Sequence, residues 1–275
     1  MYPECVPADS VLEQEFGERF NKFALLAQRT SIKELSGGLT NRNFLIETPT
    51  DKYVARVSSN SSDFLAIDRG SEFINTTIAG EGGVGAEVLD YIPGEGLLLI
   101  SYISGKTYGA DDVASNLPRI ATSLRALHSL KPFDHEFNMF NTQSNYFKIV
   151  KEQGFRVPDA YVDFEPMVAQ IKKAFEPLFE GLVPCNNDLL PGNFIDDGKK
   201  IWLIDYEYSG NNDACFEIGN VWAEAFLPIE ALEELVTAYF GSHRPDKVAR
   251  AWLWALMAKY GWTLWASIQD SVSEI

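Results

Sequence analysis

The chain has 275 residues, a formal net charge of −16 at pH 7, 46% hydrophobic residues and 23% charged residues. This length allows one large domain or two modest ones, and the composition is that of an ordinary globular protein. The negative charge argues against a nucleic-acid-binding protein, because phosphates need Lys and Arg neighbours. No apolar run approaches the roughly 18 residues of a membrane span.

The N-terminus and the cysteines indicate the compartment. Residues 1–5 lack the basic and apolar regions of a signal peptide. The three cysteines, Cys5, Cys185 and Cys215, have neither disulfide nor zinc-site spacing. We therefore expect a cytoplasmic protein. The acidic balance fits either simple solubility or an anionic cleft that attracts a cation, whether Mg²⁺ or a cationic substrate.

The first hundred residues alternate between helix and strand patterns. Ser10 and Glu13 have the spacing of a capping box, which predicts a helix over residues 10–20. A second helix is predicted over residues 68–79, ending at Gly80. Strand patterns bounded by turn residues follow one another at 31–35, 43–48, 52–58, 87–91 and 97–102.

After Gly105 the helical period dominates. Helices are predicted over residues 114–130, 164–179, 229–240 and 246–269. Val183 and residues 201–204 have the pattern of short buried strands. The strand-rich part ends near Ser104, and no repeat or low-complexity linker separates the parts. We therefore expect an α+β chain with two lobes, residues 1–104 and 105–275, that share one cleft.

Two short segments beside apolar runs carry carboxylate and amide oxygens. Asp188 and Asn193 lie in one loop, and Asp205 ends an apolar strand. Phosphoryl transfer needs a carboxylate that orients a hydroxyl and hard oxygen ligands for Mg²⁺. Burying Asp205 without a partner would be costly, and a bound cation would remove that cost. The alternative is that Asp188 or Asp205 caps a helix.

A glycine pair and a cation lie among the N-terminal strands. Gly37 and Gly38 connect two predicted strands, where backbone can approach a phosphate, although the segment also suits a plain hairpin turn. Arg56 lies in an apolar strand, from which it could extend to solvent or reach nucleotide phosphates. Glu72 could pair with Arg56, or it could be one of several solvated acids on its helix.

Taken in order, these segments resemble the choline/ethanolamine kinase family, within the protein-kinase-like fold shared with aminoglycoside phosphotransferases. Residues 35–41 resemble its nucleotide loop, 187–193 its catalytic loop and 204–210 its metal-binding segment. The Glu-Tyr-Ser-Gly continuation of the last segment is the most specific of these. Residues 262–265 resemble its Trp-x-Leu-Trp motif. The resemblance covers the chain from about Ile32 onward and implies a bilobal fold. Its N-lobe would be an antiparallel sheet with one main helix, and its larger C-lobe would be mainly helical.

The resemblance also implies roles for individual residues. Asp188 would be the catalytic base, Asn193 and Asp205 would bind Mg²⁺, and Arg56 would replace the phosphate-contacting Lys, with Glu72 as its partner. The other residues expected to contact ATP lie in the nucleotide loop and in the hinge between the lobes: Ser36, Gly37, Gly38, Thr40, Asn41, Ser101 and Tyr102.

Three residues are implied in substrate binding. Trp262 and Trp265 would wall the choline pocket, and Glu224 would be its anionic contact. A quaternary ammonium cannot donate a hydrogen bond, so aromatic faces and negative charge must hold it. The two tryptophans are three residues apart and share one helix face. The alternative is that they are core residues of a terminal helix.

One residue departs from the family pattern. The catalytic loop of the family carries His where this chain has Asn186. That His is a structural hydrogen-bonding residue, and Asn also offers donors and an acceptor, so we expect activity to survive. We expect His128 to be a satisfied helix residue rather than a catalytic one.

The predicted function is ATP-dependent phosphorylation of the hydroxyl of choline or a related amino alcohol, by direct in-line transfer with Mg²⁺. Two alternatives remain open. One is an ethanolamine or aminoglycoside-type small-molecule kinase. The other is a catalytically degenerate kinase-like binding protein, which Asn186 favours and the intact Asp188, Asn193 and Asp205 oppose.

Overall fold

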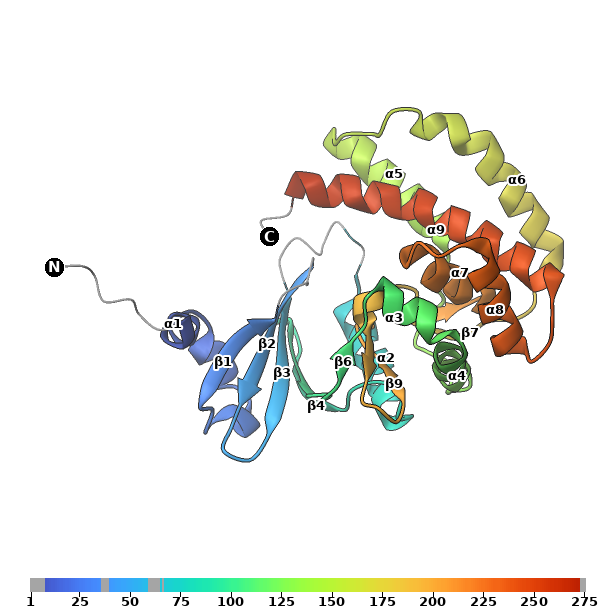
Figure 1. Cartoon of the computed structure of the whole chain (residues 1–275). Coiled ribbons are helices and arrows are strands. Elements are labelled where there is room, and N and C mark those ends of the chain that lie inside the picture. Colours follow the sequence, from blue (N-terminus) through green and yellow to red (C-terminus); the bar gives the residue numbers. More distant parts are fainter. Residues whose placement is uncertain (1–7, 36–39, 59–64, 66, 273–275) are drawn as a thin grey trace.

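The structure, a computed structural model, describes residues 8–35, 40–58, 65 and 67–272. An antiparallel sheet forms the N-terminal part, and the C-terminal part is mainly helical, as expected for an α+β bilobal protein (Figure 1). Within the described residues, no helix has the length and apolar character needed to cross a membrane.

The N-terminal sheet contains five strands in the described part of the chain. They are β1 Ser31–Leu35, β2 Asn41–Glu47, β3 Lys52–Ser58, β4 Val88–Ile92 and β5 Leu97–Ser101. Their order is β1-β2-β3-β5-β4, and neighbouring strands are antiparallel. The five predicted strands are therefore confirmed, with bounds that differ by at most two residues. Alternate side chains of these strands bury one apolar face of the sheet.

Two helices flank this sheet. Helix α1 (Ala8–Phe20) packs Phe16 and Phe20 against Phe44 of β2. It begins before the predicted start, so Ser10 lies inside the helix and is not its cap. Helix α2 (Arg69–Glu81) begins after Asp68, whose side chain accepts two backbone hydrogen bonds of the first turn. It continues one residue past Gly80, because the helical hydrogen bonds continue to the Gly82 amide.

The helices of the C-terminal part lie together on one side of the N-terminal sheet (Figure 1). They are α3 Ala110–Ser115, α4 Leu117–His128, α5 Met139–Gln153, α6 Glu165–Phe175, α7 Ala214–Glu224, α8 Ile229–Phe240 and α9 Pro245–Val272. Helix α7 packs against α8 and α9, and α5 packs along α9. The predictions of α8 and α9 are confirmed, with α9 extending slightly at both ends.

Two predicted helices are shorter than expected because of proline. The segment 114–130 divides at Asn116 into α3 and α4, and Pro118 occupies the first turn of α4. The segment 164–179 is α-helical to Phe175 and continues as a 3₁₀ turn that contains Pro177. Proline lacks a backbone N–H and clashes with the preceding turn, so it suits a helix start and ends a continuous helix.

Helices α5 and α7 were not predicted. Most of α7 is buried, so it lacks the polar face that gives an amphipathic period. Both helices carry a signal that could have revealed them. Asn138 and Asp213 cap their first turns through side-chain oxygens, and Gly154 ends α5 in a left-handed conformation.

Short strands in the C-terminal part position the loops that follow them. They are β6 Lys106–Thr107, β7 Val183–Cys185, β8 Phe194–Asp196, β9 Ile201–Leu203 and β10 Gly210–Asn212. Strand β7 pairs with β10, and β8 lies between β6 and β9. The strands predicted at Val183 and at 201–204 are confirmed as β7 and β9. Their C-terminal ends lead directly into the segments that carry Asp188 and Asp205.

Candidate active site

Asp188 lies in the loop that follows β7. The preceding residue, Asn187, has a left-handed φ of 68°, a conformation that Asn tolerates better than most residues. Burial raises the pKa of Asp188 well above its usual value, and the carboxylates of Asp205, Glu207 and Glu224 add to this rise. A carboxylate with a raised pKa is a stronger base, which suits proton abstraction from an alcohol.

Hydrogen bonds through the backbone hold Asp188, Asn193 and Asp205 together. The side-chain amide of Asn193 donates to the Asp188 carbonyl oxygen at 2.7 Å. The Ile204 amide donates to the Asn193 carbonyl oxygen at 3.0 Å, directly before Asp205. The structure thus brings the predicted base and the two predicted metal ligands into one cluster.

Asn186 links the same two segments. Its side-chain amide donates to the carbonyl oxygens of Ile204 at 3.1 Å and Asp205 at 2.9 Å. Its side-chain oxygen accepts the Asp188 amide at 3.1 Å. Because the Asn side chain uses both its donor and its acceptor, it connects the loop to the Asp205 segment.

Arg56 occupies the centre of a buried charge network. The structure places Arg56 on β3 in an ion pair with Glu72 of α2. Its Nη2 also lies 2.9 Å from Asp205 Oδ1. Arg69 extends the network, with its Nη1 2.6 Å from Glu72 Oε2 and 3.3 Å from Glu207 Oε2. The guanidinium groups are thus held between carboxylates of both lobes.

Glu207 is a site residue that sequence reasoning mentioned only as part of a motif. It accepts hydrogen bonds from the Thr40 hydroxyl at 2.6 Å and the Asn41 side-chain amide at 2.7 Å. Burial raises the pKa of Glu207 to about 7, the Asp205 carboxylate adds to the rise, and Arg56 opposes it. Its position two residues after Asp205 was the available signal. Glu207 therefore joins the start of β2 to the Asp205 segment.

The predicted loop residues Ser36, Gly37 and Gly38 lie outside the described residues. Thr40 and Asn41, which complete the predicted loop, are buried against Glu207.

The oxygen donors of the cluster fit a divalent cation. Asp205 Oδ1 is buried and lies outside hydrogen-bonding geometry with its neighbours, although Arg56 is close. The amide nitrogen of Asn193 is used in the bond to Asp188, so its side-chain oxygen is the atom offered to a cation. Carboxylate and amide oxygens are ligands that Mg²⁺ prefers. Asp205 and Asn193 therefore suit the metal-binding role predicted for them.

Glu217 on α7 holds the loop that carries Asp188 through hydrogen bonds to its backbone. One carboxylate oxygen accepts the amides of Asn186 at 2.7 Å and Asn187 at 2.9 Å. The other lies 2.7 Å from Nε2 of His128, whose Nδ1 is 2.7 Å from the Tyr239 hydroxyl. His128 is thus a satisfied helix residue, as expected. Sequence reasoning missed Glu217, and its signal was an acid among the apolar residues at the start of the segment 214–224.

Cys185, His128 and Glu217 are buried side by side, and each has an atom of a kind that can bind a metal ion. The Cys185 sulfur lies 3.7 Å from His128 Nε2. The carboxylate and imidazole atoms of this group are already engaged in hydrogen bonds, so we interpret it as structural support for the catalytic loop.

An aromatic group stands beside the cluster. The Trp265 indole donates to the Tyr208 hydroxyl at 2.6 Å, and the rings of Tyr208 and Trp262 meet edge to face with centroids 5.0 Å apart. Trp262 also contacts Phe137. The structure thus brings both predicted tryptophans to Tyr208, which lies three residues after Asp205 and was named in the sequence only as part of the Glu-Tyr-Ser-Gly motif. Both tryptophans are only partly buried.

Glu224 ends α7, and its carboxylate contributes to the raised pKa of Asp188, after the effects of burial, Asp205 and Glu207. It therefore lies within electrostatic range of the predicted base. Its Oε1 is 2.7 Å from the ammonium nitrogen of Lys259 on α9.

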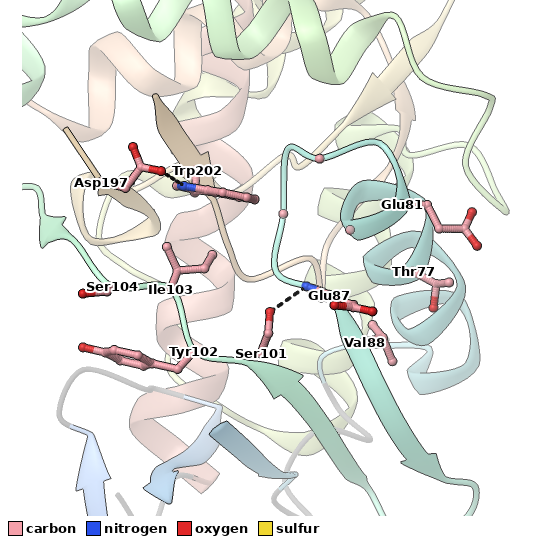
Figure 2. A pocket seen from close by; sticks show the side chains of 13 residues that line it. Thr77, Glu81, Glu87, Val88, Ser101, Tyr102, Ile103, Ser104, Asp197 and Trp202 are labelled. Carbon is pink, nitrogen blue, oxygen red and sulfur yellow. Dashed lines mark hydrogen bonds between the residues drawn. The ribbon is translucent and has the colours of Figure 1, made fainter. Parts of the chain in front are cut away.

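The predicted hinge residues Ser101 and Tyr102 border a cavity of about 540 Å³ (Figure 2). The Ser101 hydroxyl accepts the Glu87 amide at 3.0 Å, and the Trp202 indole donates to the neighbouring Asp197 carboxylate at 2.8 Å. Among the described residues that line it, none is a predicted catalytic or metal-binding residue. The Ser101 amide is itself bonded to the Glu87 carbonyl oxygen. The adenine contact at this hinge stays a prediction.

The chain is similar to known proteins over most of its length. A profile of the choline/ethanolamine kinase family matches residues 32–234. Protein LicA of Haemophilus influenzae is 28% identical over 210 residues, which are 74% of this chain and 61% of that protein. A probable ethanolamine kinase of Arabidopsis thaliana is 26% identical over 283 residues, covering 89% of this chain and 74% of the plant protein.

A solved structure extends the likeness to three dimensions. The choline/ethanolamine kinase family protein of Mesorhizobium loti superposes with a TM-score of 0.82 at 28% identity, covering 94% of this chain and 87% of that one. The two-lobed protein-kinase-like fold expected from the sequence is confirmed by this match. The match of the family profile to most of the chain shows that this protein belongs to the choline/ethanolamine kinase family.

Proposed function

We propose that this protein transfers the γ-phosphate of ATP to the hydroxyl of choline or a related amino alcohol. The observation that carries the proposal is the hydrogen-bonded cluster of Asp188, Asn193 and Asp205. It combines a base with oxygen ligands at the point where loops of both lobes meet. In this proposal residues 1–104 form the nucleotide lobe and residues 105–275 the substrate lobe.

Each residue of the cluster has a distinct task. Asp188 orients the substrate hydroxyl and accepts its proton as the phosphoryl group transfers directly to the oxygen. Asn193 and Asp205 would hold Mg²⁺, which when bound would neutralise charge between the β- and γ-phosphates. Arg56 is pinned by Glu72 and Asp205, so its guanidinium is positioned for a phosphate.

The nucleotide contacts extend along the cleft. We assign the phosphates to the loop that contains Ser36, Gly37, Gly38, Thr40 and Asn41, and the adenine to the hinge at Ser101 and Tyr102. The support for the loop is its anchor: Thr40 and Asn41 are hydrogen bonded to Glu207, two residues after a proposed metal ligand.

The neighbouring aromatic group suits a cationic alcohol. Trp262 and Trp265 both contact Tyr208, and the Glu224 carboxylate acts on the pKa of Asp188. Aromatic faces and a carboxylate attract an ammonium without requiring hydrogen bonds from it. The net charge of −16 has the sign that favours such a substrate.

A substrate panel tests the proposal. The protein is incubated with ATP, Mg²⁺ and either choline, ethanolamine or an aminoglycoside, and the phosphorylated product and ADP are quantified. We expect phosphocholine and ADP, and no product when EDTA removes the metal. A higher kcat/KM with ethanolamine or an aminoglycoside would identify the other kinase class. Nucleotide binding without turnover on any of the alcohols would identify a degenerate kinase.

The bond between Glu207 and the nucleotide loop leads to a separate prediction. Glu207→Gln removes the negative charge that Thr40, Asn41 and Arg69 share and leaves one accepting oxygen, so the anchor of the loop weakens and the KM for ATP rises by about tenfold. Steady-state kinetics with ATP as the varied substrate measure this change. Thr40→Val, which removes one donor, should cause a smaller rise. An unchanged KM for ATP in both variants would show that the anchor has no role in nucleotide binding.

A further inference from the structure

Lys259 pairs with Glu224, the residue proposed as the anionic contact of the substrate. Its ammonium nitrogen lies 2.7 Å from Glu224 Oε1 and 5.0 Å from the centroid of the Phe226 ring. Lys259 precedes Trp262 by three residues on α9, so both side chains project from neighbouring positions of one helix face. An ammonium group held by a carboxylate and an aromatic ring is the arrangement proposed for the substrate itself.

We propose that Lys259 is an internal cation that competes with the cationic substrate for Glu224 and thereby sets the substrate affinity. This inference rests on the proposed function, because it takes Glu224 as the anionic contact of the amino alcohol.

The different exposure of Lys259 and Glu224 indicates that a substrate can displace their ion pair. The Glu224 side chain is 15% exposed, whereas that of Lys259 is 42% exposed. The carboxylate is therefore held inside the protein, and the ammonium can leave it for solvent. Ion pairs with one exposed partner are weak, because water and salt compete for the charged groups. A substrate can thus displace Lys259 without unfolding its surroundings.

The negative charge around Glu224 also favours a cation at Lys259. Hydrogen bonds of Asn186 join the segments of Asp188 and Asp205, Glu207 lies two residues after Asp205, and Glu224 adds a fourth carboxylate. Two cations of the network, Arg56 and Arg69, serve the nucleotide side. Lys259 offsets the negative charge near Glu224 while no substrate is bound.

Competition of this kind acts on binding. A cationic alcohol must either displace Lys259 from Glu224 or bind beside it against like-charge repulsion. Both outcomes weaken substrate binding, and neither changes the proton transfer to Asp188. Removing the Lys259 charge should therefore lower the KM of a cationic alcohol more than it changes kcat.

The test compares Lys259→Met with Lys259→Arg. Methionine keeps an unbranched apolar chain against Phe226 but has no charge, whereas arginine keeps the charge. We expect Lys259→Met to lower the KM for choline and for ethanolamine by about three- to tenfold, and Lys259→Arg to stay near the unaltered protein. The KM for ATP should not change. Thermal unfolding confirms that each variant is folded.

A neutral alcohol and a double variant separate charge from shape. The choline isostere 3,3-dimethyl-1-butanol has no charge, so Lys259→Met should not improve its use. In a Glu224→Gln background the effect of Lys259→Met on choline should largely disappear, because the shared anion is absent. An equal gain for the neutral alcohol, or a full gain in the Glu224→Gln background, would overturn the competition proposal.

The remaining outcomes distinguish this inference from the proposed function. Turnover of choline or ethanolamine with an unchanged or higher KM in folded Lys259→Met overturns the Lys259 proposal alone. Absence of turnover by the unaltered protein with every alcohol of the panel overturns the proposed function, and the Lys259 proposal with it.

Discussion

Replacing Asp188 with Asn should lower kcat by about 10²- to 10⁴-fold, the usual contribution of a general base. The amide keeps the shape of the side chain but cannot accept the proton of the substrate hydroxyl. Asp188 contributes its backbone carbonyl to the bond with Asn193, and that bond does not depend on the side chain. The metal-binding segment should therefore stay in place. Steady-state kinetics with choline and calorimetric titration with Mg-ATP measure the two properties.

The matched control is Asp270→Asn, the same chemical change at an exposed position of α9. It should leave kcat and nucleotide affinity near those of the unaltered protein. Retained ATP binding with lost turnover in Asp188→Asn supports the role as base. Undiminished turnover in a folded Asp188→Asn protein would refute that role.

Replacing Glu217 with Ala should lower the free energy of unfolding by about 3–5 kcal/mol. The change leaves the amides of Asn186 and Asn187 without their shared acceptor, and His128 without its carboxylate partner. All of these groups are buried, so water cannot replace the lost hydrogen bonds. Urea unfolding followed by circular dichroism measures the loss. Activity should also fall, because the loop that carries Asp188 loses its support.

Two variants calibrate this result. Glu217→Gln keeps one oxygen that can accept both loop amides, so its loss should be about 1–2 kcal/mol. Glu230→Ala changes an exposed acid at the start of α8 and should stay within about 0.5 kcal/mol of the unaltered protein. A loss below about 1 kcal/mol in Glu217→Ala would show that the loop does not depend on this carboxylate.

Local patterns predicted most of the secondary structure. Strand β2 buries Phe44 and Ile46 at alternate positions, β5 is a short apolar run, and α8 has a clear apolar face, so the patterns of these elements are visible in the sequence. Helix α7 was missed because burial on most sides removes that period. The break at Asn116 was missed although Pro118 signalled it, because the helical period continues across the break.

Local patterns also predicted part of the candidate site. Asp188 and Asn193 lie in the loop after one short apolar strand and Asp205 follows another, so their positions at strand ends could be anticipated. Glu217 and Glu207 could not be assigned in this way, because their roles depend on hydrogen-bond partners far away in the chain. Glu207 meets Thr40 across 167 residues, and no local pattern encodes that contact.

By itself, the sequence determined which carboxylate, amide and aromatic side chains the site could use, and which family the chain resembles. The segments with Asp188, Asn193 and Asp205 and the Trp-x-Leu-Trp motif can be recognised from the order of residues alone, without any interatomic distance. The resemblance already implied the pair of Arg56 and Glu72. Only the tertiary structure showed that Arg56 also meets Asp205 and that Glu224 meets Lys259. The physical reason is that an ion pair forms where folding brings two side chains within a few ångströms, and residues 35 positions apart, such as Glu224 and Lys259, are brought there by the packing of α7 on α9.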